Sequence, residues 1–197
     1  MQTLANYFPI KKLADRMSDE EFYEFCLANK HLRIERDEQS NVFIMSPVGS
    51  RSGIYESKLI AFLEMWNLEH QLGYVFSSSA GFKLPDTSVR SADAAWLSKA
   101  KWDKLSEADK KGFAAVVPEF IIELRSESDH LETLQEKMGK WLENGVELAW
   151  LIDPEEQQVW IYRNGQAVEH RQGFERKLAG ESILPGFEFD LQVLSGI

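Results

Sequence analysis

The stretch PEFIIELRS, residues 118–126, decides the fold because it places an acid inside an apolar run. Its pattern predicts a buried strand over residues 119–124, with Glu123 inside it. A carboxylate in a buried strand is costly unless it is paired or binds a metal. Glu123 therefore carries information about function that an acid on the surface does not.

The chain on both sides of this strand predicts further helices and strands. Downstream, we expect a helix over 130–143, ended by Asn144 and Gly145, and then an apolar strand over 147–152. Residues 158–163 are predicted to pair with that strand as a hairpin. Upstream, residues 89–97 predict a strand that carries Asp93, an acid in a second apolar setting.

The amino-terminal part predicts a helix and a hairpin. Ser18 and Glu21 have capping-box spacing, so a short helix is expected over 19–29. A hairpin over 31–36 and 41–46 should follow it. An amphipathic helix over 52–70 is expected next, and its apolar side is marked by Leu59, Phe62, Leu63, Trp66 and Leu68.

The remaining segments complete the predicted order of elements. Residues 1–16 are expected to be a weakly structured lead-in, and 98–117 a loop with one helical turn from Ser106. The order predicts an α/β fold with a mixed sheet flanked by helices, in one domain over residues 1–197. It does not fit a doubly wound fold, because βαβ units do not repeat along the chain.

Composition narrows the classes of protein that this chain can be. The 197 residues are 44% hydrophobic, which suits a globular protein with a sizeable core. No apolar run is long enough to predict a membrane span, and the start of the chain lacks signal-peptide order. The single cysteine, Cys26, excludes an internal disulfide and a cysteine zinc cluster, so a cytoplasmic location is expected. A net charge of -10 argues against a broad surface for binding polyanions.

The two acids in apolar strands predict a metal site. Side chains alternate between the two faces of a strand. If the strands of Asp93 and Glu123 are neighbours, the two acids can lie on the same face of the sheet and converge. Two carboxylates and the backbone carbonyl of Leu124 would form an oxygen ligand set that suits Mg²⁺ or Mn²⁺. Such an ion polarises a phosphodiester and lowers the pKa of an attacking water. Lys137, on the following helix, would orient that water or stabilise negative charge.

Three stretches together resemble a known family. They are VRSADAAW at 89–96, PEFIIELRS at 118–126 and KMGKWLENGVELAWLIDP at 137–154. The chain resembles the PD-(D/E)XK nuclease superfamily, and within it the Uma-two family of bacterial restriction endonucleases, from residue 17 to residue 191. The resemblance implies a restriction endonuclease-like core, here with an amino-terminal helix and hairpin added to it.

The resemblance also implies roles for individual residues. Asp93 matches the first acid of the family and Glu123 the second. The usual lysine is replaced by Arg125, which stays protonated, and Lys137 matches a lysine displaced to the next helix. Glu56 matches an additional acid that some members of the superfamily carry. The proline that usually precedes the first acid is also absent, because Ala92 stands there.

Each of these residues also has an ordinary structural explanation. Asp93 would then be a strand-end acid bonded to the backbone, and Glu123 would form an ion pair with Arg125 or Lys137 without metal. Lys137 would be a solvated helix residue, and Glu56 a surface acid. The sequence alone leaves these alternatives open.

The sequence thus predicts a Mg²⁺- or Mn²⁺-dependent endodeoxyribonuclease that acts on DNA as a homodimer. Asp93, Glu123 and the Leu124 carbonyl would bind the ion, with Glu56 as a further candidate ligand. Lys137 would position water or phosphate, and Arg125 would be an auxiliary cation. The alternative is a non-catalytic protein of nuclease fold that acts as a homo-oligomeric interaction module. Arg125 and the charge of -10 favour that alternative.

Overall fold

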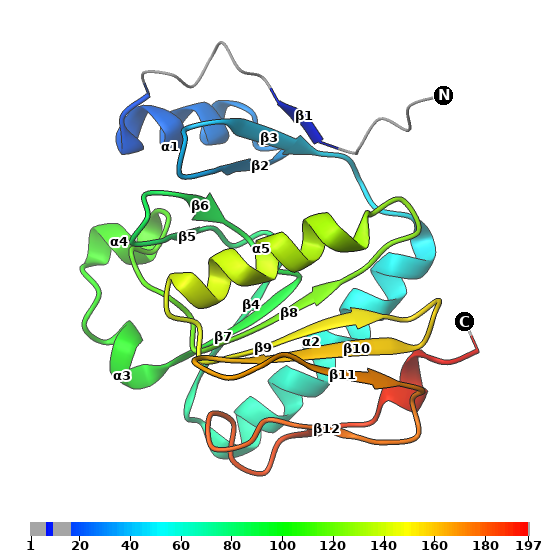
Figure 1. Ribbon diagram of the computed structural model, residues 1–197. Coiled ribbons are helices and arrows are strands. Elements are labelled where there is room, and N and C mark those ends of the chain that lie inside the picture. Colours follow the sequence, from blue (N-terminus) through cyan, green and yellow to red (C-terminus); the bar gives the residue numbers. More distant parts are fainter. Residues whose placement is uncertain (1–6, 10–16, 197) are drawn as a thin grey trace, which may run out of the picture.

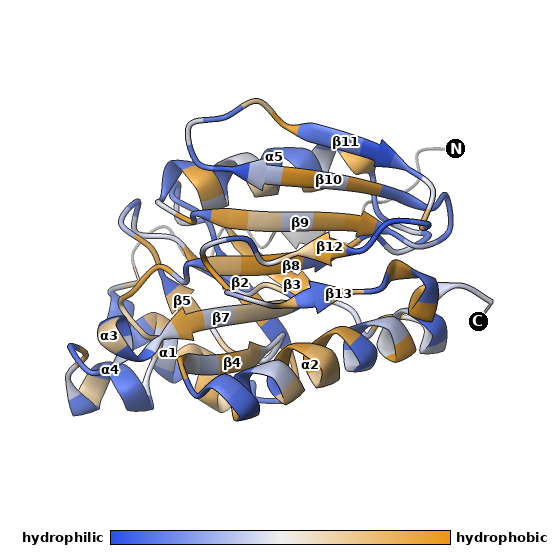
Figure 2. Cartoon of the chain, turned by 90° about the horizontal axis from the view of Figure 1, so that it is seen from below, coloured by the Kyte–Doolittle hydropathy of each residue, from blue (hydrophilic) through white to orange (hydrophobic). Residues whose placement is uncertain are grey.

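The centre of the molecule is a six-stranded sheet with the order β11-β10-β9-β8-β7-β4 (Figure 1). The computed structural model describes residues 7–9 and 17–196, so most of the predicted lead-in lies outside the described residues. The six strands are β4 (Gly73–Ser77), β7 (Ala94–Ser98), β8 (Phe120–Leu124), β9 (Leu148–Asp153), β10 (Gln158–Arg163) and β11 (Glu169–Gln172). Figure 2 shows β9 largely in the hydrophobic colour and the edge strand β11 in the hydrophilic one.

Strand direction makes this sheet mixed, as predicted. β8 and β9 are parallel, whereas the other neighbouring pairs are antiparallel. Parallel neighbours need a long crossover, and helix α5 (Leu131–Glu143) provides it. The helix ends at Asn144, and Gly145 follows with a φ of 108°, a backbone conformation that suits glycine.

Two apolar layers cover the two faces of the sheet. On one face, α2 (Ser50–His70) and the carboxyl-terminal elements form one apolar layer with side chains of β7, β8 and β9; these elements are β12 (Leu178–Ala179), β13 (Glu188–Phe189) and η1 (Leu191–Leu194). On the other face, α5 packs Leu134, Met138 and Trp141 against the sheet. Alternation along β8 therefore directs Ile122 toward α2 and Ile121 toward α5.

The amino-terminal part forms a second sheet with the order β1-β3-β2-β6-β5. Its strands are β1 (Tyr7–Pro9), β2 (Arg33–Arg36), β3 (Val42–Met45), β5 (Phe82–Lys83) and β6 (Val89–Arg90). Helix α1 (Asp19–Ala28) packs Phe22 against this sheet, and the predicted capping box of Ser18 and Glu21 is present. The predicted helix and hairpin are confirmed, but Tyr7–Pro9 is a strand rather than part of a weakly structured lead-in.

The predicted single strand over 89–97 is wrong. β6 belongs to the second sheet and pairs with β2 and β5, whereas β7 belongs to the first sheet and pairs with β4 and β8. Residues 91–93 carry the chain from one sheet to the other. The alternation of inward and outward side chains continues through residues 91–93, so the sequence pattern does not mark the boundary between the two strands. Only their different pairing partners show it. As a result, Asp93 lies where the two sheets meet.

Two smaller predictions also need correction. The segment predicted as a loop over 98–117 contains α3 (Lys99–Trp102) as well as α4 (Glu107–Lys111), the latter capped by Ser106 as expected. On α2, Leu59, Leu63 and Trp66 are buried, but Phe62 and Leu68 are exposed. Among the described residues, no helix has the length and apolarity that a membrane span needs.

Candidate functional site

Asp93 and Glu123 lie next to each other at the ends of neighbouring strands. β7 and β8 pair Ala94 with Ile122, and one further step of this antiparallel register sets Asp93 opposite Glu123. Asp93 Oδ2 accepts a hydrogen bond from the backbone N–H of Leu124 at 2.8 Å. Glu123 points to the α5 side, where its Oε1 accepts from Trp141 Nε1 at 3.1 Å. The expected convergence of the two acids is present.

Lys137 joins these acids from α5. Its Nζ lies 2.9 Å from Glu123 Oε1, and it donates to the backbone carbonyl of Ser91 at 3.0 Å. The side chain is only 10% exposed, so Lys137 is not a solvated helix residue. The contact between Lys137 and Glu123 fits a purely structural ion pair. It also fits a lysine that lies beside a metal site.

Glu35 is a member of this cluster that sequence reasoning missed. It comes from β2, is 3% exposed, and its Oε1 lies 3.3 Å from Lys137 Nζ. The same oxygen accepts from the backbone N–H of Ser91 at 3.1 Å. From the same strand, Arg33 approaches Asp93 Oδ1 at 3.8 Å. The only signal in the sequence for Glu35 as a site residue was its position inside a predicted strand. The arginines on both sides made that strand look polar and solvent-exposed.

Arg125 lines the same cavity, but its guanidinium is held by another acid. Its Nη1 lies 2.5 Å from Asp153 Oδ2, and its Nε donates to the backbone carbonyl of Asp129 at 3.3 Å. Asp153 is 2% exposed and also accepts from the backbone N–H of Glu156, as an acid at the end of a strand does. Arg125 therefore borders the cluster, and the cation that contacts Glu123 is Lys137.

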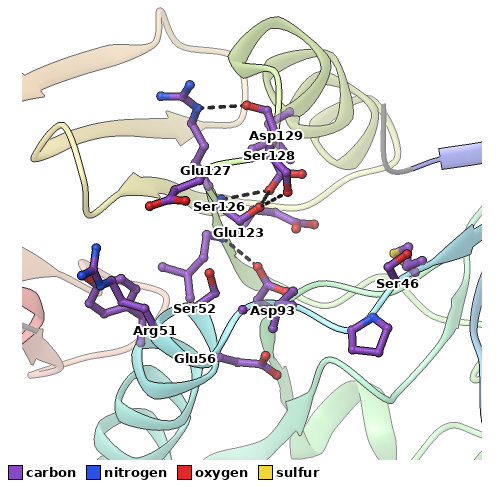
Figure 3. Close-up of a pocket in the computed structure, with 18 of the residues that line it drawn as sticks. Ser46, Arg51, Ser52, Glu56, Asp93, Glu123, Ser126, Glu127, Ser128 and Asp129 are labelled. Atoms are coloured by element: carbon purple, nitrogen blue, oxygen red, sulfur yellow. Dashed lines mark hydrogen bonds between the residues drawn. The ribbon is translucent and has the colours of Figure 1, made fainter. Parts of the chain in front are cut away.

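A cavity of about 560 Å³ opens over these residues. Its walls are the connection from β3 to α2, the first turns of α2 and the connection from β8 to α5. Glu56 projects into it from α2 (Figure 3), and its Oε1 accepts from Ser78 Oγ at 2.5 Å. Figure 3 shows Glu56 on the side of Asp93 away from the loop that carries Ser126 and Asp129.

Burial makes the ionised forms of both strand acids costly. It raises the pKa of Glu123 to about 7, and the Lys137 charge opposes this rise only in part. Burial likewise raises the pKa of Asp93, against the hydrogen bond from Leu124 and the charges of Lys137 and Arg33. The negative charges of Asp93 and Glu35 also raise the pKa of Glu123, and that of Glu56 raises the pKa of Asp93. Additional positive charge at this point would relieve that cost.

The backbone adds an oxygen on the same side. The N–H of Leu124 points to Asp93, whereas the N–H of Arg125 donates to Ile152 on β9. Within a strand, the N–H and C=O of one residue point to the same neighbour, so the Leu124 carbonyl also points to the Asp93 side. Asp93, Glu123 and this carbonyl present the hard oxygens that Mg²⁺ or Mn²⁺ prefers.

This ligand set is smaller than a full protein cage. Across the described ranges, 7–9 and 17–196, no three His, Cys, Asp or Glu side chains are grouped so that they could hold a metal by themselves. Glu56 therefore does not complete such a group with Asp93 and Glu123. A set of two carboxylates fits Mg²⁺, which usually keeps several waters and takes one or two carboxylates from the protein.

Comparison with known families decides the affiliation of the chain. A model of the Uma2 family, described as "Putative restriction endonuclease", matches residues 19–193. The chain belongs to the Uma2 family. The resemblance seen in the three sequence stretches is thereby confirmed, and all three lie inside the matched range.

A solved structure shows the same fold as this Uma2 chain. It is described as a putative nuclease belonging to DUF820, from Anabaena variabilis. The two chains are 19% identical, the TM-score is 0.71, and the match covers 91% of this chain and 97% of the other. The restriction endonuclease-like fold predicted from sequence is confirmed. No curated protein matches the Uma2 chain.

Proposed function

We propose that this Uma2 protein is a Mg²⁺- or Mn²⁺-dependent endodeoxyribonuclease that hydrolyses phosphodiester bonds of DNA. The observation that carries the proposal is that Asp93, Glu123 and Lys137 meet at one cavity, from the connection before β7, from β8 and from α5. Membership of a family described as restriction endonucleases supports the reaction class. The cytoplasm stays the predicted location, because the single cysteine does not suggest an oxidising compartment.

Each residue has a distinct part in the proposed chemistry. Asp93, Glu123 and the Leu124 carbonyl would hold the divalent cation, which when bound supplies Lewis-acid polarisation of the phosphodiester and a more acidic water. Lys137 is anchored by the Ser91 carbonyl and Glu35, so its ammonium group is held in place beside Glu123. It can orient water or stabilise the charge on the phosphate. Arg125, fixed by Asp153, can contact a phosphate but cannot accept a proton.

Cleavage of plasmid DNA tests this function. With Mg²⁺ or Mn²⁺ present, Asp93→Asn and Glu123→Gln should each lower the cleavage rate by at least about a hundredfold, because each removes one charged ligand. Glu143→Gln is the matched control, since Glu143 lies on α5 with a side chain that is 67% exposed. Cleavage that is unchanged in both site variants would reject the assigned roles.

Calorimetric titration with Mn²⁺ separates a metal site from a structural ion pair. Because burial raises the pKa of Glu123 to about 7, protons should compete with the ion at this carboxylate. The apparent affinity should therefore fall about tenfold from pH 8 to pH 6, and binding should be lost in Glu123→Gln. Absence of heat at either pH would favour the ion-pair explanation of Glu123 and Lys137.

A homo-oligomeric interaction module is the second candidate, and an apolar surface favours it. Met65 and Leu68 on α2 are 66% and 63% exposed, and Leu72 and Tyr74 continue this surface to β4, an edge strand of the six-stranded sheet. An open edge with exposed apolar side chains suits pairing with a second copy. Sedimentation should show a dimer that Met65→Glu dissociates. A monomeric wild-type protein at micromolar concentration would exclude the homodimer for either function.

A further inference from the structure

Two smaller cavities lie near the candidate site, and Arg33 lines one of them. Each measures about 270 Å³, and together they share four lining residues, Tyr23, Ser79, Gly81 and Phe113. We refer to the two cavities together as the aromatic groove. The rings that line it are Tyr23, Phe76, Trp102 and Phe113, and the lysines are Lys30 and Lys110. Its lining residues come mainly from α1, from β5 and from the α3–α4 region.

The aromatic groove and the candidate site share a wall. Arg33 lines both the 560 Å³ cavity and the groove. Ser78 and Ser91 also line the groove, and they contact the site directly: Ser78 donates to Glu56, and the Ser91 carbonyl accepts from Lys137. The two regions are therefore adjacent, and a ligand that lies over Asp93 reaches the groove by passing Arg33, Ser78 and Ser91.

Charge separates the two regions sharply. Six carboxylates line the site cavity, those of Glu56, Asp93, Glu123, Glu127, Asp129 and Glu155. Among the described residues that line the groove there is no Asp or Glu, although the chain has 32 of them and a net charge of -10. Lys30, Arg33 and Lys110 line the groove instead; Arg33 also lies 3.8 Å from Asp93, and Lys110 pairs at 3.1 Å with Glu107, an exposed acid outside the lining. Such a local reversal of sign is what a polyanion needs on an acidic protein.

Partly exposed aromatic rings line the groove beside these cations. Tyr23 and Phe113 make an edge contact with ring centroids 5.2 Å apart, and Phe76 and Trp102 lie 5.8 Å apart. All four rings are half-buried, so each keeps part of its surface open. Lys110 Nζ lies 5.8 Å from the centroid of Trp102, which combines a cation and a ring at one place. Rings alternating with cations are typical of grooves for unpaired bases.

We propose that the aromatic groove binds a single-stranded segment of DNA that adjoins the bond to be cleaved. This inference rests on the proposed nuclease function and adds its substrate class. Base stacking on side-chain rings requires unpaired bases, because a duplex covers the faces of its bases. The acids also lie deep, with side chains 17% exposed for Asp93 and 4% for Glu123, and a single strand reaches such a depth more readily than a duplex.

Binding measured without metal tests the groove independently of cleavage. The probe is a labelled oligothymidylate, and fluorescence anisotropy is followed against salt in the presence of chelator. Trp102→Ala should weaken binding about tenfold, whereas Trp102→Phe should stay close to wild type, because phenylalanine keeps a ring for stacking. Lys110→Ala should lower the slope of log affinity against log salt by about 0.7, the value for one phosphate contact on a single strand. Lys177→Ala is the matched control, because Lys177 is 57% exposed and pairs with Glu188 away from the groove.

The outcomes distinguish this inference from the proposed function. Equal binding by wild type, Trp102→Ala and Lys110→Ala would overturn the groove assignment, as would tighter binding of a duplex of the same length. Plasmid cleavage that depends on Asp93 would still support the nuclease in that case. Conversely, oligothymidylate binding that follows the groove variants, without cleavage of any DNA, would keep the groove and reject the nuclease.

Discussion

Two adjacent residues of β8 lie in opposite environments. Ile122 is fully buried in the apolar layer under α2, whereas Glu123, one residue later, is buried on the α5 side with Lys137 and Trp141. The strand is thus a boundary between a face that only packs and a face that holds charge. The apolar face contributes stability, and the charged face keeps part of its electrostatic cost uncompensated.

The difference between the two faces shows where this fold accepts the electrostatic cost of buried charges. Three carboxylates, those of Glu35, Asp93 and Glu123, face two cations, Lys137 and Arg33, so full ionisation of the acids would leave an excess of negative charge in a buried place. Natural proteins retain such arrangements mainly where a ligand or a reaction uses them. Substitutions on the two faces of β8 should therefore differ in kind as well as in size.

The largest effect is expected from removing the cation of the charged face. Lys137→Met leaves Glu35 and Glu123 buried without their shared partner, so the free energy of unfolding should fall by about 4 kcal/mol at pH 8. Urea denaturation measures it. Lys140→Met, on the same helix with a side chain that is 39% exposed, is the control and should behave as wild type. Equal stability of the two variants would show that the cluster does not depend on Lys137.

A similar but slightly smaller loss is expected on the apolar face. Ile122→Ala removes a fully buried side chain from the core and leaves a cavity, so the free energy of unfolding should fall by about 3 kcal/mol. The Mn²⁺ affinity of the folded variant should not change, because Ile122 points away from the acids. Loss of metal affinity in this variant would contradict the idea that the apolar face and the charged face of β8 act independently.

An effect of equal or smaller size, and of opposite sign, should come from Glu123→Gln. Burial raises the folded-state pKa of Glu123 to about 7, above its ordinary value, so the folded protein holds this proton more tightly than the unfolded chain does. Ionisation therefore lowers stability as pH rises toward and through 7. Above that pH, Glu123→Gln should be more stable than wild type by on the order of 1–3 kcal/mol, and the gain should shrink toward pH 5. Thermal unfolding at several pH values measures this; a constant difference across pH would contradict it.

The sequence predicted correctly those helices and strands whose ends depend only on neighbouring residues. The capping box at Ser18 and the helix stop at Asn144 and Gly145 were recognisable, because neighbouring residues alone satisfy those helix ends. The strand with Glu123 was recognisable because its apolar run is continuous. These segments fix the order of elements and therefore the class of fold.

Other features depend on partners far along the chain, so the sequence did not reveal them. The break between β6 and β7 follows from two different sheets, although alternation continues through it. Glu35 enters the site only because β2 lies beside α5, and a short hairpin strand carries no local mark of that. Arg125 was predicted to be an auxiliary cation of the site, but its guanidinium pairs with Asp153, and that pairing depends on the parallel neighbour β9.

The contact of Glu35 with Lys137 joins residues 102 positions apart in the chain. During synthesis on a ribosome, β2 emerges long before α5, so the charged cluster has no complete form until most of the polypeptide has left the exit tunnel. A fragment released early would lack the anchored ammonium group beside Glu123. Premature translation products of this protein should for that reason lack the nuclease activity proposed above.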